Sequence, residues 1–202
     1  MNHSLNIRTA TLNDLPQIAS ICLKTGANGK DATPLLSRET LVSQLYAEPY
    51  LRYDLTTCFV LTVNNLVLGY VIGALDTSEF NQWMNSTWLP SIRPDYSDVS
   101  PKSELEASFL DRLALEFETP DIAGQYPSHL HVDILSEGQG LGAGRLLLNR
   151  LFDELTVQGS TGVHLGVGLK NKSAISFYRH LGFETLSQDS YALILGMKLP
   201  RT

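Results

Sequence analysis

The spacing of hydrophobic and polar positions along the chain predicts a definite order of strands and helices. Apolar runs bounded by turn residues predict strands at 5–10, 58–63, 66–75, 129–135, 162–168 and 191–199. Apolar positions at helical spacing predict helices at 13–23, 38–46, 142–155 and 171–183. Because strands and helices alternate over the last third of the chain, the pattern predicts an α/β sandwich with a partly parallel sheet.

The regular pattern stops between residues 76 and 127, where no strand is predicted. We interpret this stretch as an insertion in a single domain that spans residues 1–202, since long irregular insertions are often lids or binding loops. Residues 104–118 within it are acidic and amphipathic. Trp83 and Trp88 are expected in the core of the insertion, because tryptophan is usually buried.

Composition and charge narrow the classes of function. The chain has 202 residues, 43% of them hydrophobic, and a net charge of -6. This charge argues against nucleic acid or an anionic membrane as the main partner. No apolar run approaches the roughly 18 residues of a membrane span, and no secretory signal core is present. The two cysteines, Cys22 and Cys58, have no motif spacing and are expected to be reduced packing residues. These features predict a cytoplasmic globular protein.

Four glycines stand at every second position from Gly138 to Gly144, directly before a leucine-rich helix. A glycine-rich turn between a strand and a helix commonly binds anions, because the first N–H groups of the helix lack partners and the helix dipole is positive there. Arg145 adds a cation to the first helical turn, which is unfavourable unless an anion shares the site. The turn therefore predicts phosphate binding.

Two phosphate-binding motifs fit this turn poorly. The nucleoside-triphosphate loop needs a Lys-Ser or Lys-Thr pair after the glycines, and the sequence has none there. Gly138, Gly140 and Ala143 match the G-x-G-x-x-A pattern of dinucleotide-binding folds, but the acidic residue expected about 20 positions on is missing. A nicotinamide-dependent enzyme is therefore the lesser alternative.

A third motif fits both the turn and the chain downstream of it. Gln139, Gly142 and Gly144 match the pattern Q/R-x-x-G-x-G/A. A second pattern, N-x-x-A-x-x-F-Y-x-x-x-G-F, is matched by Asn171, Ala174, Phe177, Tyr178, Gly182 and Phe183. With these two motifs in this order, the chain resembles the GNAT superfamily of N-acetyltransferases.

A subgroup of that superfamily is indicated by the phrases HLHVDIL (129–135) and GVHLGVG (162–168) and by the long insertion before them. In these features the chain resembles the acetyltransferase-like domain associated with O-GlcNAc hydrolases and its stand-alone bacterial relatives. The chain departs from the usual superfamily pattern at Ser136, where proline is common, and in the length of residues 76–127.

The resemblance implies a fold and a cosubstrate. The GNAT fold has a central mixed, twisted sheet with helices on both faces, and its fourth and fifth strands splay apart to hold acetyl-CoA (coenzyme A). In that family the glycine turn binds the pyrophosphate, the fourth strand binds the pantetheine arm through its backbone, and the next helix contacts the cofactor. No metal is expected. The implied cofactor-binding residues are Ile134, Leu135, Gln139, Leu141, Gly142, Ala143, Gly144, Arg145, Asn171, Ala174 and Tyr178.

The catalytic groups are an acid and a base. Tyr178 stands at the position of the family's general acid, which protonates the departing thiolate, although helical spacing alone favours a core aromatic. His129, His131 and Asp133 alternate along one predicted strand, so their side chains share a face, and His164 on the next strand could join them. Histidine suits base chemistry near neutral pH. We expect His131 and Asp133 to provide the general base. The alternative for each histidine is a structural role in which its ring is held by a hydrogen bond.

The sequence thus predicts an N-acetyltransferase in which an amine attacks acetyl-CoA directly in a ternary complex. The alternative is a non-catalytic acyl-CoA-binding or interaction module of the same fold. A small-molecule amine and a protein amine both stay open as acceptors, and residues 25–34 form the loop where many relatives shape the acceptor site. The acidic side chains of 104–118 are interpreted as a solvated helix face. No nucleic acid or membrane partner is expected, and a homodimer, the commonest soluble assembly, stays open.

Overall fold

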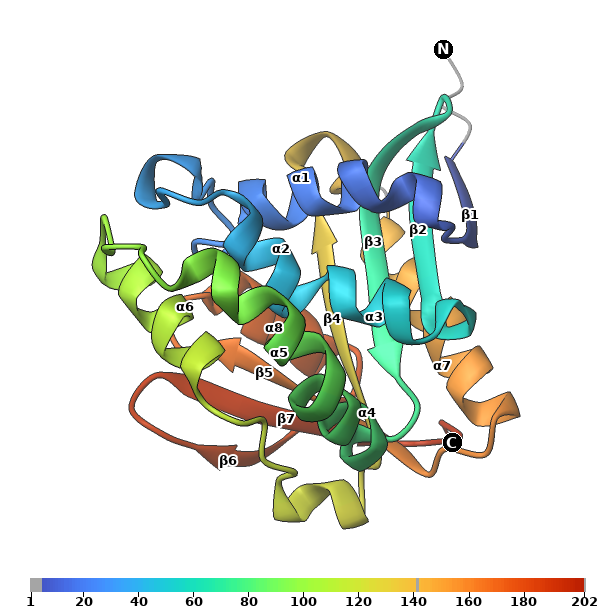
Figure 1. The fold of residues 1–202 in the computed structure, drawn as a ribbon. Helices are drawn as coiled ribbons and strands as arrows, with labels where there is room; N and C mark the ends of the chain where they lie inside the picture. Colours follow the sequence, from blue (N-terminus) through green and yellow to red (C-terminus); the bar gives the residue numbers. More distant parts are fainter. Residues whose placement is uncertain (1–4, 141, 202) are drawn as a thin grey trace.

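The computed structural model describes residues 5–140 and 142–201. They form a seven-stranded sheet in the order β1-β2-β3-β4-β5-β7-β6 with helices on both faces (Figure 1). Neighbouring strands are antiparallel except β4 and β5, which run parallel. This mixed sheet confirms the predicted fold class. The strands are β1 (Leu5–Thr9), β2 (Cys58–Val63), β3 (Leu66–Ala74), β4 (Ser128–Ile134), β5 (Gly162–Gly168), β6 (Glu184–Gln188) and β7 (Ala192–Lys198).

Two hydrophobic cores cover the two faces of the sheet. The first lies between the strands and α1 to α6, and the second involves α7 and α8. Figure 1 shows α1 to α6 in front of the strands and α7 behind them. No helix among the described residues is both long and apolar enough to cross a membrane. The helices are α1 (Leu15–Thr25), α2 (Thr40–Tyr46), α3 (Glu48–Tyr53), α4 (Thr77–Trp83), α5 (Leu89–Ile92), α6 (Glu104–Ala114), α7 (Ala143–Val157) and α8 (Lys172–His180). Short 3-10 turns lie at Leu12–Asp14, Thr33–Leu35, Leu55–Thr57, Arg93–Tyr96, Asp121–Gly124 and Ser136–Gly138.

β4 and β5 are paired only near their beginnings. Ser128 pairs with Val163 and His129 with His164, and the later residues of these two described strands are not paired with each other. β4 continues along β3, and β5 continues along β7 as far as Gly168. The two strands therefore separate, as the family resemblance implied. We call the region between them, beyond His129 and His164, the β4–β5 opening.

The segment between β3 and β4 is helical rather than irregular. It contains α4, a π-helical turn at Met84–Trp88, α5 and α6, and its buried side chains join the first core. Trp83 and Trp88 stack with ring centroids 6.0 Å apart, and both pack against that core as expected. The indole N–H of Trp88 also donates to the Gln44 carbonyl at 2.8 Å. The segment is thus fastened to the helices over the sheet.

Glu106 on α6 corrects the interpretation of residues 104–118 as a solvated acidic face. Its exposed fraction is 0%, and its carboxylate accepts hydrogen bonds from the backbone N–H groups of Ser37, Arg38 and Lys102 and from the Ser37 hydroxyl. Burial favours the protonated form, but these hydrogen bonds outweigh it and hold the pKa of Glu106 below its ordinary value. Glu106 therefore joins α6 to the start of α2 and does not face a substrate.

Two elements outside that segment were also missed by the sequence pattern. α3 is only six residues long and begins with a proline in its first turn, so it presents too little periodicity to detect. β6 is a short edge strand whose side chains are mostly exposed and polar, so it lacks an apolar run. Both free cysteines, Cys22 and Cys58, are buried as predicted.

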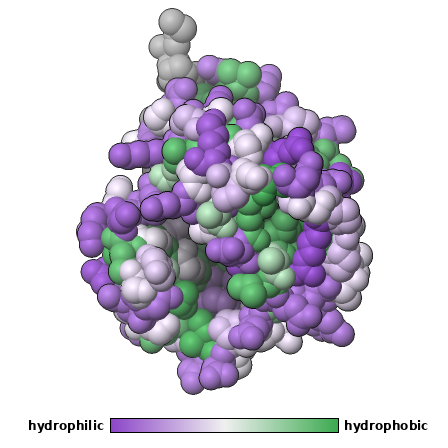
Figure 2. All heavy atoms as spheres, turned by 60° about the vertical axis from the view of Figure 1, so that its left-hand side comes forward, coloured by the Kyte–Doolittle hydropathy of each residue, from purple (hydrophilic) through white to green (hydrophobic). Residues whose placement is uncertain are grey.

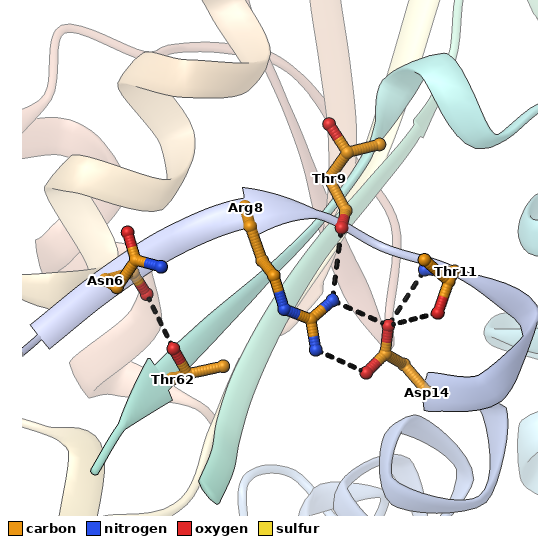
Figure 3. Close-up of polar contacts among 6 residues, drawn as sticks. All are labelled: Asn6, Arg8, Thr9, Thr11, Asp14 and Thr62. Atoms are coloured by element: carbon orange, nitrogen blue, oxygen red, sulfur yellow. Dashed lines mark hydrogen bonds and ion pairs between the residues drawn. The ribbon is translucent and has the colours of Figure 1, made fainter. Parts of the chain in front are cut away.

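The opposite edge of the sheet carries a compact polar cluster, shown in Figure 3. Arg8 on β1 forms two parallel hydrogen bonds to the Asp14 carboxylate, at 2.8 Å and 2.7 Å. The backbone N–H and hydroxyl of Thr11 donate to the same carboxylate at 2.8 Å and 2.9 Å. These contacts lower the pKa of Asp14 to about 2, with the Arg8 hydrogen bonds as the largest cause. The cluster fixes the approach from β1 into α1.

Candidate functional site

The β4–β5 opening is lined by unpaired backbone groups. The Leu135 N–H donates to the Leu68 carbonyl at 2.9 Å, so odd-numbered residues of β4 direct their backbone groups to β3. Val132 and Ile134 therefore direct theirs toward β5. Since the two strands no longer pair at this point, these groups face the opening. By the same alternation, β5 contributes Gly166. Such an edge can bind an extended amide chain as an added strand.

Leu135 differs from its neighbour at this edge. Its N–H is bonded to Leu68, and its carbonyl accepts from the Gly138 N–H at 2.9 Å. The Ile134 carbonyl accepts from the Gln139 side-chain amide at 2.8 Å, so the Ile134 N–H is the group left to the opening. Val132, which sequence reasoning missed, offers both of its backbone groups. The missing signal was the register with β3, which decides which residues of β4 face outward.

The glycine turn places the beginning of α7 beside the opening. Gly140 and Gly142 have φ of 77° and 71°, a left-handed conformation that favours glycine. The backbone bond from the Leu146 N–H to the Gly142 carbonyl, at 3.2 Å, opens the helix. The N–H groups of the first turn, at Ala143, Gly144 and Arg145, therefore have no helical acceptor. Leu141, also expected in this site, lies outside the described residues. The turn has the donors and the dipole of an anion site.

Packing also requires glycine at two positions of this turn. A Cβ on Gly144 would lie 2.9 Å from Cζ of Phe177, so α8 packs directly on the beginning of α7. A Cβ on Gly138 would lie 3.0 Å from Cγ2 of Ile134. Arg145 is exposed and has no hydrogen bond or ion pair within the described residues. Its charge is therefore free to act on an anion at the helix end.

α8 borders the opening with its first turn. The Asn171 side-chain carbonyl accepts from the Ala174 N–H at 3.1 Å and so caps α8. The loop between α1 and α2 reaches the same place, because a side chain on Gly29 would contact the Asn171 amide nitrogen, at 3.7 Å from Cβ. This loop belongs to residues 25–34, where the acceptor site was expected. Asn171 and Ala174 thus lie between the end of β5 and that loop.

Tyr178 on α8 has a free hydroxyl. Tyr178 is only 8% exposed, yet its hydroxyl has no hydrogen bond to any described residue. No buried side-chain nitrogen or oxygen of the described residues lacks a partner, so this hydroxyl is not sealed from solvent. Burial, reinforced by the nearby charge of Asp133, raises the pKa of Tyr178. The hydroxyl therefore carries its proton at neutral pH and can donate it.

His129 and His164 are structural. The Thr77 hydroxyl donates to the Pro127 carbonyl at 2.6 Å, so Nδ1 of His129, 2.9 Å from that hydroxyl, must be the donor between them. Nε2 of His129 then accepts from the Tyr50 hydroxyl at 2.7 Å. His164 Nδ1 lies 2.8 Å from the Tyr126 carbonyl and donates to it. Burial lowers the pKa of both histidines, and both imidazoles are neutral.

His131 and Asp133 differ from these two histidines. The His131 ring packs edge-on against Tyr46 and Tyr50, with centroids 5.8 Å and 5.3 Å away, and it has no hydrogen bond within the described residues. Burial lowers the pKa of His131 to about 4. Asp133 accepts from the Tyr70 hydroxyl at 2.6 Å; burial raises the pKa of Asp133 although this bond opposes the shift. His131 thus keeps a free lone pair at neutral pH.

The face toward which β5 points is hollowed. It is the left-hand side of Figure 1 and comes forward in Figure 2, where two lobes flank a deep depression. Among the described residues, no group of three or more His, Cys, Asp or Glu side chains is placed to hold a metal ion.

Comparisons with known proteins agree with this geometry. The family model described as "Acetyltransferase (GNAT) family" matches residues 31–183. Protein O-GlcNAcase of Rattus norvegicus is 24% identical over 196 residues, which cover 92% of this chain and 21% of that protein. The same protein of Mus musculus is 24% identical over 176 residues, covering 82% of this chain and 19% of its own length. The chain thus spans about a fifth of the curated relatives it matches.

Solved structures share the fold over nearly the whole chain. SsHAT is 28% identical with a TM-score of 0.86, and the match covers 98% of this chain and all of that chain. YncA of Salmonella typhimurium, solved with its cofactor acetyl-CoA, is 16% identical with a TM-score of 0.61, covering 98% of this chain and 96% of that chain. At 16% identity this second likeness shows the fold alone.

Proposed function

Since the chain belongs to the acetyltransferase (GNAT) family, whose general chemistry is acyl transfer from acetyl-CoA, we propose that it is an N-acetyltransferase acting on an amine in a ternary complex. One observation carries this proposal. The β4–β5 opening joins an unpaired strand edge to the free N–H groups of α7. The Tyr178 hydroxyl, which has no hydrogen bond within the described part of the chain, reaches solvent from the adjoining helix α8.

The residues around the opening fit acetyl-CoA. The pyrophosphate is expected at the first turn of α7, held by the N–H groups of Ala143 and Gly144 and by the charge of Arg145. The amides of the pantetheine arm are expected along Val132 and Ile134, whose backbone groups lack strand partners. On the other side, Asn171 and Ala174 at the beginning of α8 border the same space. Bound acetyl-CoA supplies the thioester that is attacked.

The transfer needs two proton movements. The attacking amine must lose a proton, and neutral His131 offers a free nitrogen to take it, with the Asp133 carboxylate two residues along the strand. The C–S bond of the thioester breaks as the C–N bond forms, and the thiolate leaves. Tyr178, protonated at neutral pH, donates its proton to that sulfur. The backbone N–H groups of β4 at the opening are expected to polarise the thioester carbonyl.

One observation favours a second candidate function, an acyl-CoA-binding module without turnover. The pKa of His131 is lowered to about 4 by burial, so the proton it would accept is held weakly. A module of this kind would still use the strand edge and the α7 turn. It would bind acetyl-CoA but release no CoA in the presence of amines.

Calorimetry with acetyl-CoA, followed by measurement of CoA release with a panel of amines, separates these functions. We expect binding of acetyl-CoA, and turnover with at least one class of amine.

Arg145→Gln should weaken acetyl-CoA binding by about fivefold, because the cation at the helix end is removed. Arg150→Gln, on the same helix but ion-paired to Glu154, is the matched control and should bind as the wild type does. Binding without turnover would favour the module; no binding at millimolar acetyl-CoA would refute both.

A further inference from the structure

The environment of Arg112 on α6 points to a particular class of acceptor. This inference rests on the proposed function and narrows it. We propose that the acceptor amine carries a carboxylate, which Arg112 binds, while the amine itself lies beside His131 and Asp133 on β4. An amino acid, in which one molecule holds both groups, is the simplest acceptor of this class.

An aromatic cluster connects α6 to β4. It consists of Tyr46, Tyr50, Phe109 and His131, and Tyr46 lies between the two elements. The ring of Tyr46 is 5.7 Å from that of Phe109 on α6 and 5.8 Å from that of His131 on β4, measured between centroids. Arg112 stands three residues after Phe109, so both project from neighbouring positions on α6. Arg112 is thereby placed at the α6 end of the cluster, with His131 at the other end.

The guanidinium of Arg112 has a carboxylate nearby, that of Glu118, whose charge acts on it without direct contact. It stacks on Phe117, 3.4 Å from the ring centroid, and donates one hydrogen bond to the Glu116 carbonyl at 3.2 Å. It forms no ion pair within the described residues. Burial lowers the pKa of Arg112. Burial raises the pKa of Tyr46 and of Tyr50, and the charge of Arg112 opposes part of that rise.

The ion-paired arginines provide a contrast. Arg8, Arg38, Arg52 and Arg150 all have carboxylate partners, although their side chains are 42–54% exposed and well solvated. Arg112 is more buried than these, yet it forms no ion pair with any residue that the structure describes. A partly buried cation without a carboxylate in direct contact is costly, and arginine is the residue best suited to bind a carboxylate with two parallel hydrogen bonds. The missing partner is therefore expected to be a carboxylate that arrives with the substrate.

The charges at the two ends of the cluster suit a dipolar ligand. Asp133 provides the carboxylate on this side of β4, and Arg112 provides the cation on α6. Between them, the hydroxyl of Tyr46 and the ring nitrogens of His131 have no hydrogen bond within the described residues and are free to bind polar groups. A lysine in a basic peptide would instead bring further positive charge toward Arg112. The Glu106 carboxylate on α6 is already hydrogen-bonded to Ser37, Arg38 and Lys102.

Matched acceptor pairs test the proposal. Turnover with acetyl-CoA is measured for a series of free amino acids and for the corresponding amino-acid amides, which keep the amine and the side chain but lack the carboxylate. We expect kcat/KM to be about 30-fold higher or more for the acids, since the amide leaves Arg112 unpaired. Equal kcat/KM for acids and amides would overturn the proposal, as would a preference for lysine-containing basic peptides.

Variants of Arg112 assign the preference to this residue. Arg112→Gln should raise KM for the acids by about 30-fold while leaving KM for the amides and acetyl-CoA binding unchanged. Arg112→Lys keeps the charge and should restore part of the preference for acids. Arg52→Gln, which removes an exposed ion pair to Glu48 on α3, is the control and should leave both series unchanged. Thermal unfolding of each variant checks that the protein is folded. If a folded Arg112→Gln protein showed an equal rise in KM for acids and for amides, Arg112 would not be the residue that binds the carboxylate.

The calorimetric titration of acetyl-CoA distinguishes failure of this inference from failure of the proposed function. If acetyl-CoA binds and amides or peptides are acetylated as well as acids, the function stands and the carboxylate-bearing acceptor is wrong. If acetyl-CoA does not bind, or binds without turnover of any amine, the function fails and this inference fails with it.

Discussion

The two histidines at the closed end of the β4–β5 opening contrast with the histidine just inside it. His129 and His164 form the last pair between β4 and β5, and each is held by hydrogen bonds to the surrounding chain. His131 is the next residue on the same face of β4, beyond the point where pairing ends, and it has aromatic neighbours but no hydrogen bond within the described residues. The same residue type thus has a structural role where the strands are joined and a free nitrogen where they part.

This contrast shows how the sheet creates a site. Where the strands pair, the chain satisfies its own polar groups, as buried groups require. Where they separate, the backbone of Val132 and Ile134, the ring of His131 and the hydroxyl of Tyr178 are left for a ligand. Function is therefore expected to be concentrated on one side of the pair His129–His164 and stability on the other, and the following experiments test that division.

The largest expected effect is the loss of the proton donor in the opening. Tyr178→Phe removes one hydroxyl that has no hydrogen bond to any described residue, so the fold and acetyl-CoA affinity should change little. If Tyr178 protonates the leaving thiolate, kcat should fall by about 100-fold. Steady-state kinetics and calorimetry measure the two quantities. Tyr53→Phe, which removes a hydroxyl among the aromatic rings of α3 and α4, is the control. An unchanged kcat would exclude Tyr178 as the acid.

Replacing His129 should cost stability rather than chemistry. His129→Phe keeps an aromatic ring but leaves the Tyr50 hydroxyl without its acceptor and deprives Thr77 of a donor. Leaving buried polar groups unpaired should lower the free energy of unfolding by about 2–3 kcal/mol. His131→Phe breaks no hydrogen bond among residues 5–140 and 142–201, and it should lower the free energy of unfolding by less than about 1 kcal/mol. Urea denaturation at pH 7.5 compares the two, and equal losses would contradict the division.

The pH dependence of stability provides a separate test of His131. Its pKa is about 4 in the folded protein against 6.5 in the unfolded chain, so both states are neutral above pH 6.5. As the pH falls from 6.5 toward 4, the unfolded chain binds the proton first, and stability is lost. Between pH 7.5 and 4.5 this loss should be about 2 kcal/mol smaller in His131→Phe than in the wild type. Parallel urea curves are the measurement, and identical pH profiles would mean that His131 is not desolvated.

Much of the opening could be predicted from sequence, because glycine turns and helix caps are local features. The strand, the turn at Gly138–Gly144 and the helix behind it are encoded by adjacent residues, as is the Asn171 cap. Which β4 residues face the opening is not local, since it depends on the register with β3. The sequence therefore predicted that the backbone of Ile134 and Leu135 binds the cofactor. The pairing of β4 with β3 instead leaves the backbone groups of Val132 and Ile134 directed toward the opening.

The acceptor side of the site was beyond sequence reasoning for the same reason. Tyr46, Arg112 and His131 come from α2, α6 and β4, and no spacing along the chain connects them. Glu106 was expected in solvent because α6 is acidic, but its partners are backbone N–H groups of a distant loop and of the turn before the helix. Backbone donors carry no signal in the side-chain pattern. Only the folded chain shows which charges remain free.

The smallest expected effect is a loss of stability far from the opening, at the ion pair of Arg8 and Asp14. It depends on pH in a lower range than the effect of His131 does. Arg8→Met removes the two hydrogen bonds to Asp14, an ion pair that is half in solvent on the Arg8 side (Figure 3). The loss should be about 1 kcal/mol, because an exposed partner is screened by water. The folded pKa of Asp14 is about 2 against 3.8 unfolded, so this contribution is complete above about pH 5 and declines as the pH falls toward 2. Urea curves of wild type and variant between pH 7 and 2.5 should therefore differ by a constant amount down to about pH 5 and then converge. A difference that already shrinks between pH 6.5 and 5 would place the titrating group at the histidines instead.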